Sequence, residues 1–288
     1  MSNSNTLNSD PFISQESKVN SAQECILSVK NLSFSHGKSP VVRSVTLDFY
    51  SGRHYVLAGP NGAGKSTLLD LLSHLKDPAK GKISIFGKDS STYSPLELAK
   101  VLALAPQNFQ FNFTFTVREI VSLGRRPYLG RWGRLSPEDE AVVERCIEIL
   151  NLKKLAGRLV TGLSGGEAQR VVLARTLAQA TPIVLLDEPT ASLDVAQALD
   201  LMARVQVLTK EDKILVITVT HDLHLAAVYA DEMVFLKNGR LVAAGPLAKT
   251  LTPPLLREVF DADSEVHPDP FTGGLNISFR HPTMPLKD

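Results

Sequence analysis

The feature that most constrains this chain is one glycine-rich run, Gly59-Pro60-Asn61-Gly62-Ala63-Gly64-Lys65-Ser66-Thr67. It contains the pattern G-x-x-x-x-G-K-[ST], in which a glycine-rich turn points backbone N–H groups at phosphate oxygens and the next helix adds its positive N-terminal end. Lys65 would reach the β- and γ-phosphates of a nucleotide, and the Ser66 hydroxyl would hold Mg²⁺. The run therefore predicts a nucleotide site.

The residues on either side of this loop favour the prediction over a chance match in an ordinary glycine-rich turn. A phosphate-binding loop follows a buried strand and opens a helix. Residues 55–58 are a short apolar run, and four leucines after the loop have helical spacing: Leu68, Leu69, Leu71 and Leu72.

Two adjacent acids follow a second apolar run. Residues 183–186 are Ile-Val-Leu-Leu, which is typical of a strand buried on both faces, and they deliver Asp187 and Glu188. Asp187 would hold Mg²⁺ or its waters, and Glu188 would accept the proton of an attacking water. The alternative is a solvated acidic turn before Pro189.

Two more polar side chains stand just beyond predicted strands. Gln107 follows residues 101–105, and His221 follows residues 214–219. Alone, such a glutamine is more often a solvated loop residue and such a histidine a structural hydrogen-bonder. Since open α/β sheets bind ligands at the carboxyl ends of their strands, Gln107 could face the ligand, and His221 could polarise a γ-phosphate or orient the water.

A second glycine pair precedes a predicted helix that runs to Ala180, in the segment Ser164-Gly165-Gly166-Glu167. Bare backbone amides at a helix N-terminus can approach a phosphate, so this is a second possible anion site. An ordinary helix start with a flexible entry explains the pair equally simply.

Patterns outside these motifs predict a tail, further strands and helices, and an aromatic cluster. Residues 1–23 are rich in Ser and Asn and are expected to be a disordered tail. Strands are expected at 26–32, 41–49 and 83–87, a hairpin at 233–244, and a helix at 254–260 before a strand-like run at 275–279. Capping boxes at Ser94 and Thr116 predict helix starts, and Ser136-Pro137-Glu138-Asp139 predicts another. The cluster Phe109, Phe111, Phe113 and Phe115 could be core or a partner-docking surface.

Composition limits the partners and the compartment. The formal net charge of +1 gives no reason to expect nucleic acid as the main partner. The two cysteines, Cys25 and Cys146, match no metal or redox spacing, so both are expected to be buried thiols of a reducing compartment. The sequence shows neither a signal-peptide pattern nor an apolar run long enough to span a bilayer, which predicts a cytoplasmic protein.

Taken in order, these motifs resemble the ABC-type ATPases, from about Ile26 to Ala248: the phosphate loop, Gln107, LSGGE ending at Glu167, IVLLDEP, Ser192-Leu193-Asp194 and His221. The resemblance implies an α/β fold with a P-loop NTPase (RecA-like) core, an antiparallel β subdomain and a helical subdomain inserted at about 108–165. The ATPase domain would cover residues 24–248, and residues 249–288 would be a C-terminal extension.

The same resemblance implies a head-to-tail homodimer with two ATP molecules between the subunits. Each ATP would be gripped by the phosphate loop of one subunit and by Ser164, Gly165 and Gly166 of the other. Gln107 becomes a contact to Mg²⁺ or water and a sensor for a membrane partner, and Asp194 would link the two sites.

One position departs from the family pattern. An aromatic residue normally stacks on adenine after the first strand, whereas the matching residue here is His36, with Phe34 nearby. An imidazole can still stack, so His36 is assigned to the adenine.

Segments in the insertion and the tail are similar to those of ATPase subunits that import iron siderophores, haem and cobalamin: FTVREIVSLGRRPYLGRWGRLSPED, LTPPLLREVF and DPFTGG. This implies an ATPase that powers uptake of a metal chelate, with an iron–siderophore complex favoured. Two copies of a separate transmembrane permease and, indirectly, a substrate-binding protein would be its partners at the cytoplasmic face of the inner membrane.

The sequence argues against two rival classes of protein. A soluble ABC protein that acts on DNA or the ribosome generally has a coiled-coil insertion or a duplicated cassette, and the sequence shows no extended heptad run and no second phosphate loop. A P-loop kinase would leave LSGGE and the position of His221 unexplained.

Overall fold

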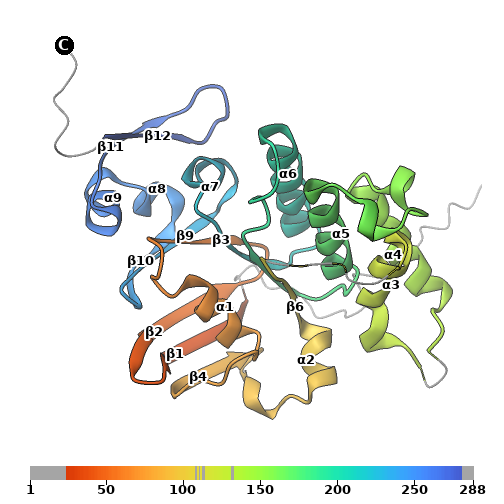
Figure 1. Ribbon diagram of the computed structural model, residues 1–288. Helices are drawn as coiled ribbons and strands as arrows, with labels where there is room; N and C mark the ends of the chain where they lie inside the picture. The colour runs from red at the N-terminus through yellow and green to blue at the C-terminus, as the bar shows by residue number, and fades with distance from the viewer. Residues whose placement is uncertain (1–23, 108, 110, 112–113, 131–132, 281–288) are drawn as a thin grey trace, which may run out of the picture.

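The computed structural model describes residues 24–107, 109, 111, 114–130 and 133–280 (Figure 1). The tail predicted at residues 1–23 lies outside this part of the chain, as does Phe113. The described residues form three β-sheets with helices packed on them, and two of these sheets make the body that carries the phosphate loop.

The larger sheet has six strands in the order β10-β9-β3-β8-β7-β6. Five of the strands are parallel, and β10 pairs antiparallel with β9 as the predicted hairpin. Their bounds are β3 His54–Ala58, β6 Leu102–Ala105, β7 Ile183–Asp187, β8 Leu215–Val219, β9 Glu232–Lys237 and β10 Arg240–Pro246.

Side chains of β7 show why these strands are so apolar. Ile183 and Leu185 belong to one buried cluster, and Val184 and Leu186 belong to another. Because successive side chains of a strand point to opposite faces, β7 is covered on both sides and every position in it must be apolar.

The second sheet is antiparallel, with strands in the order β2-β1-β4-β5. It packs with helix α1 (Lys65–Leu72) against one face of the larger sheet. Its strands are β1 Cys25–His36, β2 Ser39–Tyr50, β4 Lys80–Ile85 and β5 Lys88–Asp89. The first two are longer than predicted, because the pairing continues to a turn at residues 37–38.

The insertion between β6 and β7 is mostly helical and packs on the other face of the larger sheet together with α6 (Figure 1). The capping boxes predicted at Ser94 and Thr116 are present, and the helix predicted to start at Ser136 does so with a capping box of its own. Inside the insertion lie α3 Val117–Ser122, α4 Pro137–Ile149 and α5 Gly165–Leu177, with short 3-10 turns at Leu123–Tyr128, Lys153–Leu155 and Val160–Gly162. Helix α2 Pro95–Val101 and a 3-10 turn at Ser90–Thr92 precede β6, and α6 Val195–Glu211 follows β7. Helix α5 thus ends before Ala180.

The described phenylalanines of the cluster at residues 109–115 differ in burial, so they do not share one of the two predicted roles, core or docking surface. Phe109 and Phe111 pack edge to face, with centroids 4.7 Å apart, against the buried cluster of the insertion. Phe115 is 40% exposed. The first two therefore belong to the core, and a docking role is left to the exposed part.

The C-terminal part adds a third buried cluster and a two-stranded sheet. The sequence predicted one of the two strands of this sheet. Its elements are α7 Leu223–Tyr229, α8 Leu247–Thr250, α9 Pro253–Phe260, β11 Asp263–Pro268 and β12 Leu275–Arg280. Strand β12 matches the predicted run, whereas β11 was missed. The prediction for Cys25 was wrong as well: it is exposed at the start of β1, while Cys146 is buried.

No helix among the described residues is long and apolar enough to cross a bilayer.

Candidate functional site

Strand order brings the predicted site residues to one edge of the larger sheet. Strands β3, β8, β7 and β6 are adjacent and parallel, so their carboxyl ends lie side by side. These ends lead into the phosphate loop, His221, Asp187 and Gln107, respectively. This is the edge where open α/β sheets bind ligands.

The phosphate loop depends on glycine at two positions. At Gly59, with φ +148°, a Cβ would lie 2.0 Å from the carbonyl oxygen of Leu236. At Gly64, with φ +97°, it would lie 2.7 Å from the carbonyl oxygen of Val41. A side chain at either position would therefore push the loop away from β9 or β2. Glycine at both positions allows the loop backbone to pack directly against these two strands.

Lys65 is folded into the same loop. Its Nζ donates to the carbonyl oxygens of Gly59, at 2.8 Å, and Pro60, at 3.1 Å. Burial lowers the pKa of this ammonium, while the nearby Glu188 and Asp187 oppose that effect. Such a partly desolvated cation, whose hydrogen-bond partners among the described residues are two neutral carbonyls, can bind an anion strongly.

Ser66 and Asp187 form an oxygen-rich pair beside the loop. The Ser66 hydroxyl donates to Asp187 Oδ1 at 3.2 Å. Burial raises the pKa of Asp187, and the negative charge of Glu188 adds to this effect. A cation at Asp187 would relieve this unfavourable charge. Within the described residues no group of three or more His, Cys, Asp or Glu side chains could hold a metal alone.

Glu188 is held from two sides. Gln107 Nε2 donates to its Oε2 at 2.7 Å, and His221 Nε2 lies 2.9 Å from its Oε1. Its backbone is left-handed, with φ +50°, a conformation that is uncommon for non-glycine residues. Both carboxylate oxygens are thus engaged, and three residues from three strand ends form one hydrogen-bonded group.

Lys65, Ser66, Glu188 and His221 face a cavity of about 350 Å³, whereas Asp187 and Gln107 are not among its described lining residues. Its lining consists of the phosphate loop from Asn61 to Thr67 together with Val41, Glu188 and His221. Val41 was not among the predicted site residues, since an aliphatic residue at a strand start gives no signal of its own. Ser164, Gly165 and Gly166 are not among the described residues that line this cavity.

The second glycine pair has its own surroundings. Ser164 caps helix α5 and accepts a hydrogen bond from Glu167 N in a capping box. A Cβ on Gly166 would lie 2.5 Å from Oε1 of Gln197, whose side chain in turn bonds to Asp194. The helix start and Asp194 are therefore neighbours, and neither is among the described residues that line the cavity at the phosphate loop.

The predicted adenine position lies at the end of β1. His36 is exposed, and its ring packs edge to face on Phe34 with centroids 5.0 Å apart. The described lining of the cavity does not include His36.

Comparison with known proteins identifies relatives of this chain. A family model described as ABC transporter matches residues 42–191. The chain is 42% identical over 241 residues to the hemin import ATP-binding protein of Streptomyces coelicolor, which covers 84% of this chain and 85% of the relative. It is 36% identical to the iron(3+)-hydroxamate import ATP-binding protein of Bacillus subtilis, over 85% of this chain and 91% of the relative.

A longer relative is the cobalamin import ATP-binding protein of Halobacterium salinarum, 40% identical over 252 residues and 88% of this chain. The chain spans 63% of the length of that protein.

Solved structures have the same fold. An inward-facing metal-chelate type ABC transporter is matched with a TM-score of 0.76 and 28% identity, over 89% of this chain and 96% of the matched chain. A dimeric ATP-binding cassette in a post-hydrolysis state with ADP and Pi is matched with a TM-score of 0.69 and 29% identity, over 77% and 99%. These matches confirm the predicted α/β P-loop fold. The chain belongs to the ABC transporter family and has the fold of its ATP-binding cassettes.

Proposed function

We propose that this protein is the ATP-hydrolysing subunit of an importer for a metal chelate, an iron–siderophore complex being favoured over haem or cobalamin. The observation that carries the ATPase part is the convergence of Lys65, Asp187, Glu188, Gln107 and His221 at one sheet edge. Relatives named as hemin, hydroxamate and petrobactin import proteins support the transport part.

In this proposal the loop binds the phosphates of ATP. Backbone N–H groups of residues 59–64 and the ammonium of Lys65 would hold the β- and γ-phosphates. Bound Mg²⁺ supplies a positive charge that offsets the charge on the phosphate oxygens. Ser66 and Asp187 offer the hard oxygen donors that this ion prefers, and Gln107 would join them once it leaves Glu188.

Glu188 would act as the general base. Its carboxylate lines the cavity beside the loop, where a water molecule would attack the terminal phosphate. Gln107 and His221 each contact one of its oxygens, and each oxygen keeps a further lone pair that can accept the proton of that water. His221 would orient the water or polarise the γ-phosphate.

The site would be completed by a second copy of the chain. Ser164, Gly165 and Gly166 start a helix whose amides suit an anion, and they do not line the cavity of their own chain. A head-to-tail homodimer with two ATP molecules would place them on the partner's phosphates. Asp194, beside this helix start, would link the two sites, and His36 would stack on the adenine.

Two copies of a membrane permease would receive the motion of this dimer through the exposed part of residues 109–119. This would place the protein at the cytoplasmic face of the inner membrane as a peripheral subunit. A substrate-binding protein would take part indirectly, and nucleic acid is not expected as a partner.

Phosphate release from ATP tests the proposal. The purified chain should transfer phosphate to water and not to an acceptor molecule, and Lys65→Ala should lower the rate at least about a hundredfold. Lys249→Ala, an exposed lysine remote from the loop, is the matched control. Transfer to an acceptor, or an unchanged rate in Lys65→Ala, would reject the ATPase assignment. Loss of chelate uptake in cells that carry Lys65→Ala, restored by the wild-type gene, would test transport.

A further inference from the structure

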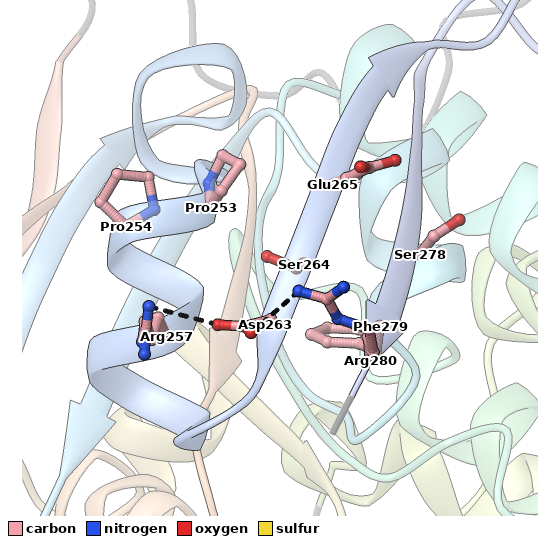
Figure 2. Close-up of a pocket in the computed structure, with 9 residues that line it drawn as sticks. All are labelled: Pro253, Pro254, Arg257, Asp263, Ser264, Glu265, Ser278, Phe279 and Arg280. Carbon is pink, nitrogen blue, oxygen red and sulfur yellow. Dashed lines mark hydrogen bonds and ion pairs between the residues drawn. The ribbon is translucent and has the colours of Figure 1, made fainter. Parts of the chain in front are cut away.

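Two carboxylates of the structure differ in how their charge is balanced. Asp263, in a cavity between helix α9 and the hairpin β11–β12, lies between two cations: Arg257 Nη1 is 3.3 Å from its Oδ1, and Arg280 Nη2 is 3.3 Å from its Oδ2 (Figure 2). Asp194 is exposed, and among the described residues its carboxylate is bonded to neutral N–H groups of Gln197. The negative charge of Asp194 is therefore left for a group outside this part of the chain.

Gln197 holds both oxygens of the Asp194 carboxylate. Its backbone N–H donates to Oδ1 at 2.8 Å, which is the N-cap bond of helix α6. Its side-chain Nε2 donates to Oδ2, also at 2.8 Å. Because hydrogen bonds are directional, two bonds to different oxygens fix the plane of the carboxylate, whereas the cap bond alone would let it turn.

The other end of the same amide lies against the start of helix α5. A Cβ on Gly166 would lie 2.5 Å from Gln197 Oε1 and 3.2 Å from Leu193 Cδ2. Glycine at position 166 therefore allows the helix start to pack directly on residues 193–197. One side-chain amide thus contacts both Asp194 and Gly166, which belong to the two segments assigned to the partner's site.

We propose that Gln197 is a positioning residue, which fixes the Asp194 carboxylate relative to the helix start at residues 164–166. The inference rests on the proposed ATP-bound homodimer, in which this helix start would reach the partner's phosphates and Asp194 would link the two sites. An exposed aspartate that turns freely must be ordered when two copies associate, and such ordering weakens association. The amide of Gln197 orders Asp194 before the copies meet.

The test is Gln197→Met, introduced into the Glu188→Gln protein and studied with saturating Mg²⁺ and ATP. Methionine has nearly the length of glutamine and a similar helix propensity, but it cannot donate to Asp194. The backbone N–H of residue 197 still caps α6, so the fold is expected to survive, and thermal melting checks this. Sedimentation should show a dimer dissociation constant at least about tenfold higher than that of the parent.

A second readout separates positioning from a structural role. Binding of a fluorescent ATP analogue to the dilute monomer reports on the phosphate loop alone, and Gln197→Met should leave this affinity within about twofold of the parent. Weaker binding of the analogue together with a lower melting temperature would show structural damage and would overturn the proposal. Gln206→Met, at a half-buried glutamine further along α6, is the matched control and should dimerise like the parent.

A double-variant cycle shows whether Gln197 acts through Asp194. Asp194→Ser keeps an oxygen that can cap α6 and removes the oxygen that accepts from Nε2. Adding Gln197→Met to Asp194→Ser should change the dimer dissociation constant less than about twofold, because the contact is already lost. A further loss as large as in the parent would overturn the proposal.

The parent protein distinguishes failure of this inference from failure of the proposed function. If Glu188→Gln stayed a monomer with ATP, the proposed dimer would be rejected and the role of Gln197 with it. If Glu188→Gln dimerised and Gln197→Met dimerised equally well, only the role of Gln197 would be rejected.

Discussion

Replacing the base of the proposed reaction should separate chemistry from binding. Glu188→Gln keeps the shape of the side chain and removes the proton acceptor. Gln107 can turn its amide to pair with the new group, so the contacts of Glu188 with Gln107 and His221 need not both be lost. The phosphate loop and Lys65 stay unchanged.

The size of the fall in kcat follows from the proposed role of Glu188 as general base. A positioned general base contributes about 10²–10⁴-fold to a rate, which corresponds to about 3–5 kcal/mol of transition-state stabilisation. We therefore expect kcat to fall by that factor. Affinity for ATP should stay the same or rise, because one negative charge has left the cavity that takes the phosphates.

Two assays check this prediction: phosphate release for kcat, and titration with a fluorescent ATP analogue for binding. Glu140→Gln, an exposed glutamate on α4, is the matched control and should keep wild-type values. If Glu188→Gln retained more than about a tenth of wild-type turnover, the base would have to be another group. If it lost ATP binding instead, Glu188 would have a structural role in the loop.

Three further predictions concern the scaffold. Gly59→Ala should abolish ATP binding, because its Cβ would lie 2.0 Å from the Leu236 carbonyl oxygen; Gly157→Ala, where a Cβ meets open space, should bind ATP normally in the same titration. Burial lowers the pKa of His54 to about 4 from an unfolded value near 6.5, so the unfolded state binds the extra proton. Urea unfolding should therefore show stability falling as pH drops from about 6.5 to 4, by up to about 3 kcal/mol, with a weaker slope in His54→Gln. Asp139→Ala leaves the buried Arg125 without its carboxylate, 2.8 Å away, and should cost about 3–5 kcal/mol in the same assay; full stability would show that the pair is dispensable.

Local patterns were sufficient for the centre of the site. The phosphate loop has a spacing that few other structures require, and apolar runs before Asp187 and His221 marked the ends of buried strands. The rule that ligands bind at the carboxyl ends of parallel strands then predicted that these residues meet, and the strand order confirms it.

Other features depend on contacts that no local pattern encodes. Strand β11 is Asp-Ser-Glu-Val-His-Pro, which has no apolar alternation, and it is a strand because β12 pairs with it. The bond between Gln107 and Glu188 joins residues 81 positions apart. Cys25 is the first residue of β1 and is exposed, whereas the buried part of the strand begins at Ile26. The hydrophobicity of a cysteine does not show on which side of such a boundary it lies.

The central claim is that the phosphate site of one chain is half of a site, which a second copy completes. Sedimentation of Glu188→Gln with and without Mg²⁺ and ATP tests it most directly, because this variant should bind ATP without hydrolysing it. The Glu188→Gln protein should be a monomer that becomes a dimer with ATP, and it should stay a monomer under both conditions when Ser164→Arg is added. A protein that binds ATP and remains a monomer at concentrations that saturate the site would contradict it.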